Sequence, residues 1–208
     1  MKLSELAYQD EDFTETDLRA IEMGEISFVG CDFSGASLAG IVCARTSFTD
    51  CVFTGAELYE SRHRASSFVG CRFERTSWHG AELIGCRLTG SSFTDCRLVP
   101  ITLTECDLTL VSFGGAKLAG TDLSGLRMRE ANLTGANLAG CNLRGADLGG
   151  ARAAGADFGG ADLRGAVVDA AIWTTARLGG AVVDVDQAVL FAAAHGLVLT
   201  PEKPAVAG

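Results

Sequence analysis

The side chains best suited to chemistry in this chain are its cysteines and histidines. The 208 residues include eight cysteines and three histidines. Cys31, Cys51 and Cys71 follow one another at intervals of twenty, and thiols brought together by such a spacing could form a disulfide or hold a metal. The chain has 26 glycines, but none of them belongs to a phosphate-binding loop that ends in Lys-Ser or Lys-Thr. What the thiols can do depends on the elements that carry them.

A five-residue repeat organises nearly the whole chain. From Phe13 to Val183 every fifth residue, here called a centre, belongs to one register with no insertion or deletion, which gives 35 centres. Sixteen centres are Leu and ten are Phe. Because helices place apolar residues every three or four positions and strands every second one, a strict period of five fits neither element alone. The sequence therefore predicts a solenoid of short, identical units.

Each unit contributes two inward residues and a turn. The position two before the centre, here called the slot, holds Ala fourteen times and Cys seven times, and the position two after it holds Gly nineteen times. Glycine suits a backbone that must turn sharply. Four such units close a square coil of twenty residues, a period that also aligns Phe13, Phe33, Phe53, Phe73, Phe93 and Phe113. Coils stacked at the inter-strand spacing would make a rod ~42 Å long.

The units CDFSG, AELYE, ANLTG and ADLRG resemble the pentapeptide-repeat family. The resemblance covers residues 13–183. It implies an all-β fold, a right-handed quadrilateral parallel β-helix. We expect an acidic leader or cap at 1–12, the β-helix at 13–183, a short capping and dimerisation helix within 184–200, and a loose tail at 201–208.

The cysteines occupy structural positions in this repeat. Seven lie in the slot and Cys43 is a centre, so we interpret them as compact buried groups in place of alanine, in preference to a disulfide or metal ladder. His63 is a lone inward centre, which is typical of a core residue. His79 lies outside and His195 near the end, with no partner for nucleophilic or acid–base catalysis. We expect no enzyme, no catalytic residues, no metal and no cofactor.

The segment after Val183 predicts a terminal helix. Asp184 or Asp186 can cap its start, Gly196 can end it, and the residues between are apolar nearly all round. One interpretation is a simple cap for the exposed end of the solenoid. The interpretation we favour is a cap that also buries its outer side in a two-fold homodimer, through Val189, Leu190, Phe191, Ala193, Leu197, Val198 and Leu199.

A closer resemblance concerns VDVDQAVLFAAAHGL, FERTSW and LTECDLTL, which are similar to mycobacterial members of the family that confer fluoroquinolone resistance. It implies a dimeric rod that imitates duplex DNA and binds DNA gyrase. No apolar run is long enough to span a membrane, and the acidic start does not resemble a secretory signal. We therefore expect a cytoplasmic protein.

The charge distribution favours a basic partner and excludes direct binding to nucleic acid. The net charge is −9, and the first 60 residues contain twelve acids against three bases. Three net negative charges per coil there match the ~2.8 per 4.8 Å of duplex DNA. The candidate DNA-mimicking residues are Asp10, Glu11, Asp12, Asp17, Glu22, Asp32, Glu82, Asp122 and Asp162. The alternative is a scaffold for another protein, with the acids serving solubility alone.

One residue breaks the pattern in the middle of the rod. Pro100 occupies a position that is usually glycine and has no N–H for stacking hydrogen bonds. We expect it to bend the rod or to loosen a coil.

Overall fold

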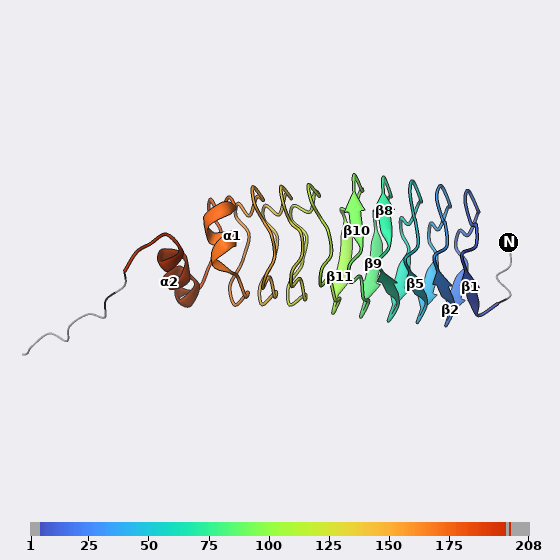
Figure 1. Cartoon of the computed structure of the whole chain (residues 1–208), viewed down its shortest axis with the longest axis horizontal. Helices are drawn as coiled ribbons and strands as arrows, with labels where there is room; N and C mark the ends of the chain where they lie inside the picture. Colours follow the sequence, from blue (N-terminus) through green and yellow to red (C-terminus); the bar gives the residue numbers. More distant parts are fainter. Residues whose placement is uncertain (1–4, 199, 201–208) are drawn as a thin grey trace, which may run out of the picture.

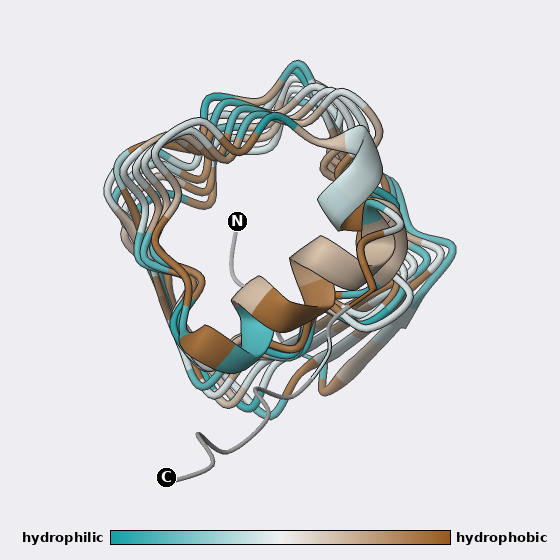
Figure 2. Cartoon of the chain, turned by 90° about the vertical axis from the view of Figure 1, so that its left-hand side faces the viewer, coloured by the Kyte–Doolittle hydropathy of each residue, from teal (hydrophilic) through white to brown (hydrophobic). Residues whose placement is uncertain are grey.

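The chain folds as an elongated rod of stacked coils in the computed structural model, which describes residues 5–198 and 200 (Figure 1). Residues twenty apart pair side by side in parallel: Phe28 lies beside Phe48 at one end, and Asp162 lies beside Val182 at the other. The view along the axis shows the coils superimposed in a square outline (Figure 2). The predicted quadrilateral parallel β-helix is confirmed.

The square coil has four walls, which we number by their centres. Wall 1 begins at Phe13, wall 2 at Leu18 and wall 3 at Met23, and wall 4 contains Phe28; each centre recurs every twenty residues. The first centres of all four walls are buried, whereas the residues on either side of them are mostly half-buried or exposed. This alternation gives each wall one inward row, as expected for short strands.

Three walls carry regular strands in the N-terminal half. Wall 4 has the sheet β1-β3-β5-β7, wall 3 has β2-β4-β6-β9-β11, and wall 1 has the pair β8-β10. Their bounds are β1 (Ala7–Gln9), β2 (Glu22–Gly24), β3 (Ser27–Val29), β4 (Val42–Ala44), β5 (Ser47–Thr49), β6 (Arg62–Arg64), β7 (Ser67–Val69), β8 (Arg72–Glu74), β9 (Ala81–Ile84), β10 (Ser92–Thr94) and β11 (Ile101–Thr104). The later coils stack through isolated bridges.

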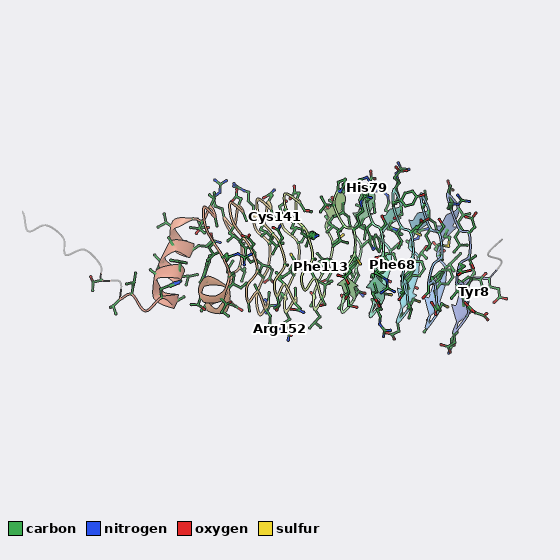
Figure 3. The ribbon with its side chains drawn as sticks, turned by 90° about the horizontal axis from the view of Figure 1, so that it is seen from above. Tyr8, Phe68, His79, Phe113, Cys141 and Arg152 are labelled. Atoms are coloured by element: carbon green, nitrogen blue, oxygen red, sulfur yellow. The ribbon has the colours of Figure 1, made fainter. Side chains whose placement is uncertain are left out.

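The aromatic centres form two continuous stacks. On wall 1 the rings of Phe13 and Phe33 lie 4.8 Å apart and nearly parallel, and on wall 4 Phe28 and Phe48 are stacked at 5.0 Å. Neighbouring walls meet edge to face, as for Phe28 and Phe33 at 5.3 Å. Both geometries are favourable for aromatic pairs. In side view, Phe68 lies inside the coils (Figure 3).

The buried cysteines and His63 complete this core. The Cys71 Sγ–H donates to the carbonyl of Phe48 one coil earlier, at 3.4 Å, and all eight cysteines are free thiols. Because Ser61 donates its hydroxyl to Leu58, its Oγ accepts from His63 Nε2–H at 3.0 Å. Burial lowers the pKa of His63 to about 3, so the ring is neutral. These residues fill space, as the repeat predicts.

Both ends of the repeat differ from the expected boundaries. Strand β1 places Tyr8 beside Phe28, so the regular coil begins inside the segment expected as a leader. Near the other end, Trp173 was expected as a wall 1 centre but lies in α1 (Ala170–Thr175). The corners of this unit are Ala170 and Thr175 instead of glycine, and its alanines favour a helix. The indole is still buried.

Helix α2 (Val185–Ala194) covers the last coil (Figure 2). Asp184 and Gln187 form a capping box at its start, as the sequence predicts for Asp184. The buried Gln187 amide also donates to the carbonyls of Leu163 and Ala166, at 2.6 and 2.8 Å. These bonds attach the helix to the last coils. Within residues 5–198 and 200, no helix is long and apolar enough to cross a membrane.

The coil that contains Pro100 is loosened, which was one of the two expected outcomes. Gly80 N–H still donates to the Pro100 carbonyl at 2.7 Å, so the stacking toward the N-terminus is complete. Toward the C-terminus the backbone hydrogen bonds are interrupted on walls 2 and 3. Two surface grooves, of about 390 and 360 Å³, lie along this opening.

Candidate protein-binding surfaces

Aspartates on the walls are held in place by the turn that follows them. The residue before a centre is often Asp, and its carboxylate accepts the backbone N–H two residues later, as in Thr14 to Asp12 at 2.8 Å and Ser34 to Asp32 at 2.8 Å. This is the usual role of Asp in a tight turn. The N–H of Thr14 lowers the pKa of Asp12 below its ordinary value. The Asp12 carboxylate is therefore a fixed negative charge at neutral pH.

A second set of acids lies at the corners of the coil, two residues after the centres. The corner backbone is left-handed, and most corners are glycine because a Cβ there is unfavourable. Within the described residues, thirteen left-handed corners nevertheless carry a side chain, and eight of these are acidic: Asp10, Glu15, Glu25, Asp50, Glu60, Asp95, Glu105 and Glu130. Unfavourable backbone at exposed positions is often retained for function.

Glycines one coil further on make room for several of these corner acids. The carboxylate of Asp10 lies over Gly30 and that of Asp50 over Gly70, where any Cβ would collide with it. Glu60 lies over Gly80 less closely, because its Cγ would be 3.3 Å from a Cβ at that position. Of these eight corner acids, only Asp10 was among the predicted site residues. An acid at the glycine position of a unit was the available signal.

Ion pairing separates the two halves of the rod. In the C-terminal half Asp147 pairs with Arg129 at 3.3 Å, and Asp162 pairs with Arg144 and Arg164 at 3.2 and 2.5 Å. The Arg164 side chain holds the pKa of Asp162 well below its usual range. Arg152 projects from the outer edge of this half (Figure 3). Arginines therefore neutralise much of the acidic charge on these later coils.

The N-terminal coils retain most of their charge. Asp17 pairs with Arg19 at 2.7 Å and Glu25 with Arg45 at 2.6 Å. Within the part of the chain that the structure describes, the remaining predicted acids of the first two coils have no ion pair: Asp10, Glu11, Asp12, Glu22 and Asp32. This cluster is here called the acidic end.

The nine predicted acids do not form one patch. Asp12 and Asp32 are neighbours on wall 1, with Asp10 at the preceding corner and Glu11 beside it. Asp17 lies on wall 2. The other four share the outward column of wall 3: Glu22, Glu82, Asp122 and Asp162.

Arginine partners reduce the net negative charge at two of these four wall 3 acids. Glu82 lies 3.8 Å from Arg62, and Asp162 has its two arginines. Asp122 has only neutral partners, because Ser124 N–H and the Asn142 amide donate to it at 2.9 and 3.0 Å. The strongest unpaired concentration is therefore the acidic end.

The other candidate surface is apolar and lies on α2. Val189, Leu190 and Phe191 are 46%, 53% and 39% exposed, and Val198 is 87% exposed. Ala193 and Leu197 are exposed too, whereas Leu199 lies outside the described residues. An apolar groove of about 220 Å³ runs between α2 and the last coil, lined by Trp173, Leu178, Ala181, Val183, Ala188 and Phe191. Exposed apolar side chains in one place are typical of a protein interface.

The described residues contain no group of three or more His, Cys, Asp or Glu side chains arranged to hold a metal. Three surface features stand out in the described part of the rod: the acidic end, the apolar side chains of α2 and the mid-rod opening.

The comparisons with known proteins agree with this architecture. The family model for pentapeptide repeats matches residues 26–62, 66–99, 101–135 and 131–168. The chain belongs to the pentapeptide-repeat family. A search of curated proteins gave no significant match.

Two solved structures of QnrB1, described as a plasmid-mediated fluoroquinolone resistance protein, have the same fold. A trypsin-treated variant is 24% identical with a TM-score of 0.81, covering 94% of this chain and 98% of that one. The full-length protein is 23% identical with a TM-score of 0.80, covering 92% and 97%. These comparisons do not confirm the similarity to mycobacterial members of the family that the sequence indicated.

Proposed function

We propose that this pentapeptide-repeat protein imitates duplex DNA, binds DNA gyrase and protects it from fluoroquinolone-type poisons. The observation that carries the proposal is the unpaired acidic end on a rigid, regularly stacked rod. The structural likeness to a fluoroquinolone resistance protein along nearly the full chain supports it. The proposed role is binding, without catalysis.

Duplex DNA presents charge at a regular spacing along a rod, and the acidic end does the same. Asp12 and Asp32 are twenty residues apart and lie side by side on wall 1, so these two successive coils offer charge at about the 4.8 Å spacing of stacked strands. Backbone N–H groups hold the wall carboxylates in place, so little side-chain entropy is lost when a basic surface binds. A DNA-binding cleft on gyrase is the partner this surface fits.

The proposed complex contains two copies of the chain. The apolar side chains of α2 lie at the end opposite to the acidic end (Figure 1). A two-fold pairing through α2 would bury them and place an acidic end at each tip of a longer rod. Gyrase would engage one or both tips. Such a complex would lower the amount of DNA held by the enzyme, and with it the number of drug-trapped cleavage complexes.

The test is DNA supercoiling by gyrase with rising amounts of the protein, with and without a fluoroquinolone. The wild-type chain should inhibit supercoiling or restore it in the presence of the drug. The variant Asp10→Asn, Asp12→Asn, Glu22→Gln, Asp32→Asn should have neither effect.

A matched variant removes four acids that already have arginine partners: Glu74→Gln, Asp147→Asn, Asp157→Asn and Asp162→Asn. It should retain most of the activity. Equal activity of wild type and the unpaired-acid variant would refute DNA mimicry by the acidic end.

The second candidate is a scaffold for another protein, and the apolar groove at α2 is the observation that favours it. Ionic strength separates the two. Binding through the acidic end should weaken steeply with salt, whereas an apolar interface should tolerate it.

A further inference from the structure

The sheet of wall 3 ends in the middle of the rod. Its strand order is β11-β9-β6-β4-β2, so β11 is an edge although the chain continues through several further coils (Figure 1). One coil later the stacking is normal: Leu123 N–H donates to Asn142 O at 2.8 Å, and Asn142 N–H donates to Thr121 O at 3.1 Å. The equivalent donors at the edge, Leu103 and Asp122, have no backbone partner in the described part of the chain.

The opening extends around the corner onto wall 2. On the N-terminal side of the opening, the N–H groups of Asp95, Leu98 and Glu105 also lack a backbone acceptor. Elsewhere in the rod, the equivalent N–H groups donate to a carbonyl of the next coil. On the C-terminal side of the opening, the N–H group of Lys117 lacks a backbone acceptor too. Pro100 lies between these residues and has no N–H to contribute. A contiguous row of backbone donors and acceptors therefore faces open space.

The space beside these unpaired groups is a surface groove between two coils. The groove beside β11 is lined by Ile101–Glu105 from one coil and by Asp122, Ser124 and Gly125 from the next, and its volume is about 390 Å³. Ile101 is only partly buried there, although slot residues are mostly buried elsewhere in the rod. An unpaired strand edge that faces a groove can accept an added strand from another chain.

The side chains around the groove indicate the chemistry of that strand. Outward residues of an added strand would lie between Thr102 and Asp122, and inward residues would lie between Leu103 and Leu123. Asp122 and Glu105 form no ion pair within the described residues. Small apolar side chains suit the inward positions and Lys or Arg suits the outward ones.

We propose that the edge of β11 is a docking site for an extended, basic segment of a partner protein, which adds a strand at the opening and alternates Lys or Arg with small apolar residues. This site is separate from the acidic end. It does not depend on gyrase being the partner.

The probe is a fluorescein-labelled peptide, acetyl-Lys-Val-Lys-Val-Lys-amide, titrated into the full chain at 0.15 M salt and followed by anisotropy. The wild-type chain should bind it saturably, and bound peptide should slow hydrogen exchange at the amides of Leu103 and Glu105. The same peptide N-methylated at every second residue should bind about tenfold more weakly, because it loses hydrogen bonds to the edge.

Two charge-reversed variants make the test specific. Glu105→Lys with Asp122→Lys should weaken binding about tenfold, since two attractive charges become repulsive. The control is Glu60→Lys with Glu22→Lys, two acids away from the groove. Glu60 matches Glu105, because both are corner residues with nearly the same φ (55° and 56°). Glu22 matches Asp122, because both lie in the outward column of wall 3. The control should bind within twofold of wild type.

Three results would overturn the proposal: no saturable binding to the wild-type chain, equal binding of the N-methylated peptide, or an equal loss in the control variant. The last would show attraction to the acidic rod as a whole. Gyrase inhibition by the variant Asp10→Asn, Asp12→Asn, Glu22→Gln, Asp32→Asn, measured in parallel, tests the proposed function separately, because that variant keeps both acids of the groove.

Discussion

Replacing the corner acid Glu60 by glycine should stabilise the rod. Glu60 is exposed and has φ of 55°, and the same corner is glycine one coil earlier and one coil later, at Gly40 and Gly80. A side chain in this left-handed conformation is unfavourable, whereas glycine adopts it freely. Within the described residues Glu60 has no ion pair that the substitution would remove.

The size of the effect follows from two opposing terms. A non-glycine residue in the left-handed region costs about 1–2 kcal/mol. Glycine adds freedom to the unfolded chain, which costs about 0.5–1 kcal/mol on folding. The difference is a gain of about 0.5–1 kcal/mol in the free energy of unfolding for Glu60→Gly. For a chain of this size that raises Tm by about 1–4 °C.

The assay is urea unfolding followed by circular dichroism, with Glu22→Gly as the matched control. Glu22 is an exposed glutamate at the first position of strand β2, where φ is not positive. Glycine there should destabilise the chain by about 0.5–1 kcal/mol. If Glu60→Gly lowered stability as much as Glu22→Gly does, the reasoning about acidic corners would be refuted. Under the proposed function, Glu60→Gly should raise stability without increasing gyrase inhibition.

Three further predictions concern the core, the acids and the helix. Phe53→Ala should lower the free energy of unfolding by about 3–5 kcal/mol in urea melts, because the ring is fully buried between two stacked neighbours at 5.0 and 4.8 Å; a loss below 1 kcal/mol would contradict the stacking. Hydrogen bonds from Ser124 lower the folded pKa of Asp122, so its contribution to stability is present above the unfolded value of 3.8 and is lost as pH falls through the folded pKa. The stability difference between wild type and Asp122→Asn in urea melts should therefore begin to decrease as pH falls to 3.8 and should vanish only below the lowered folded pKa of Asp122; a difference that does not change with pH would refute this cause. Phe191→Asp should convert the proposed dimer to a monomer in size-exclusion chromatography with light scattering; a monomeric wild type would contradict the α2 interface.

The register of the repeat was predictable because each unit contacts only its neighbours. Phe33 and Phe53 stack because they are twenty residues apart, and the same count places the cysteines in the slot. The cap at Asp184 was predictable as well, since a capping residue acts within four residues of sequence.

Features that depend on contacts between coils were not predictable in detail. The missing N–H of Pro100 predicted either a bent rod or a loosened coil. It does not tell how far neighbouring hydrogen bonds open, and the grooves extend over two walls. Arg144 reaches an acid eighteen residues away, a pairing that depends on side-chain length as well as on the column. Helix α1 replaces a unit whose Trp173 fits the register, because local helix propensity prevails where corner glycines are absent.

The most direct test of DNA mimicry is competition for gyrase between this protein and duplex DNA. Labelled protein is bound to gyrase, unlabelled linear duplex is added, and the bound fraction is read at several salt concentrations. Mimicry predicts mutually exclusive binding: duplex displaces the protein in proportion to its own affinity, and the protein's binding weakens steeply with salt. A ternary complex that holds both, at unchanged affinity, would contradict it.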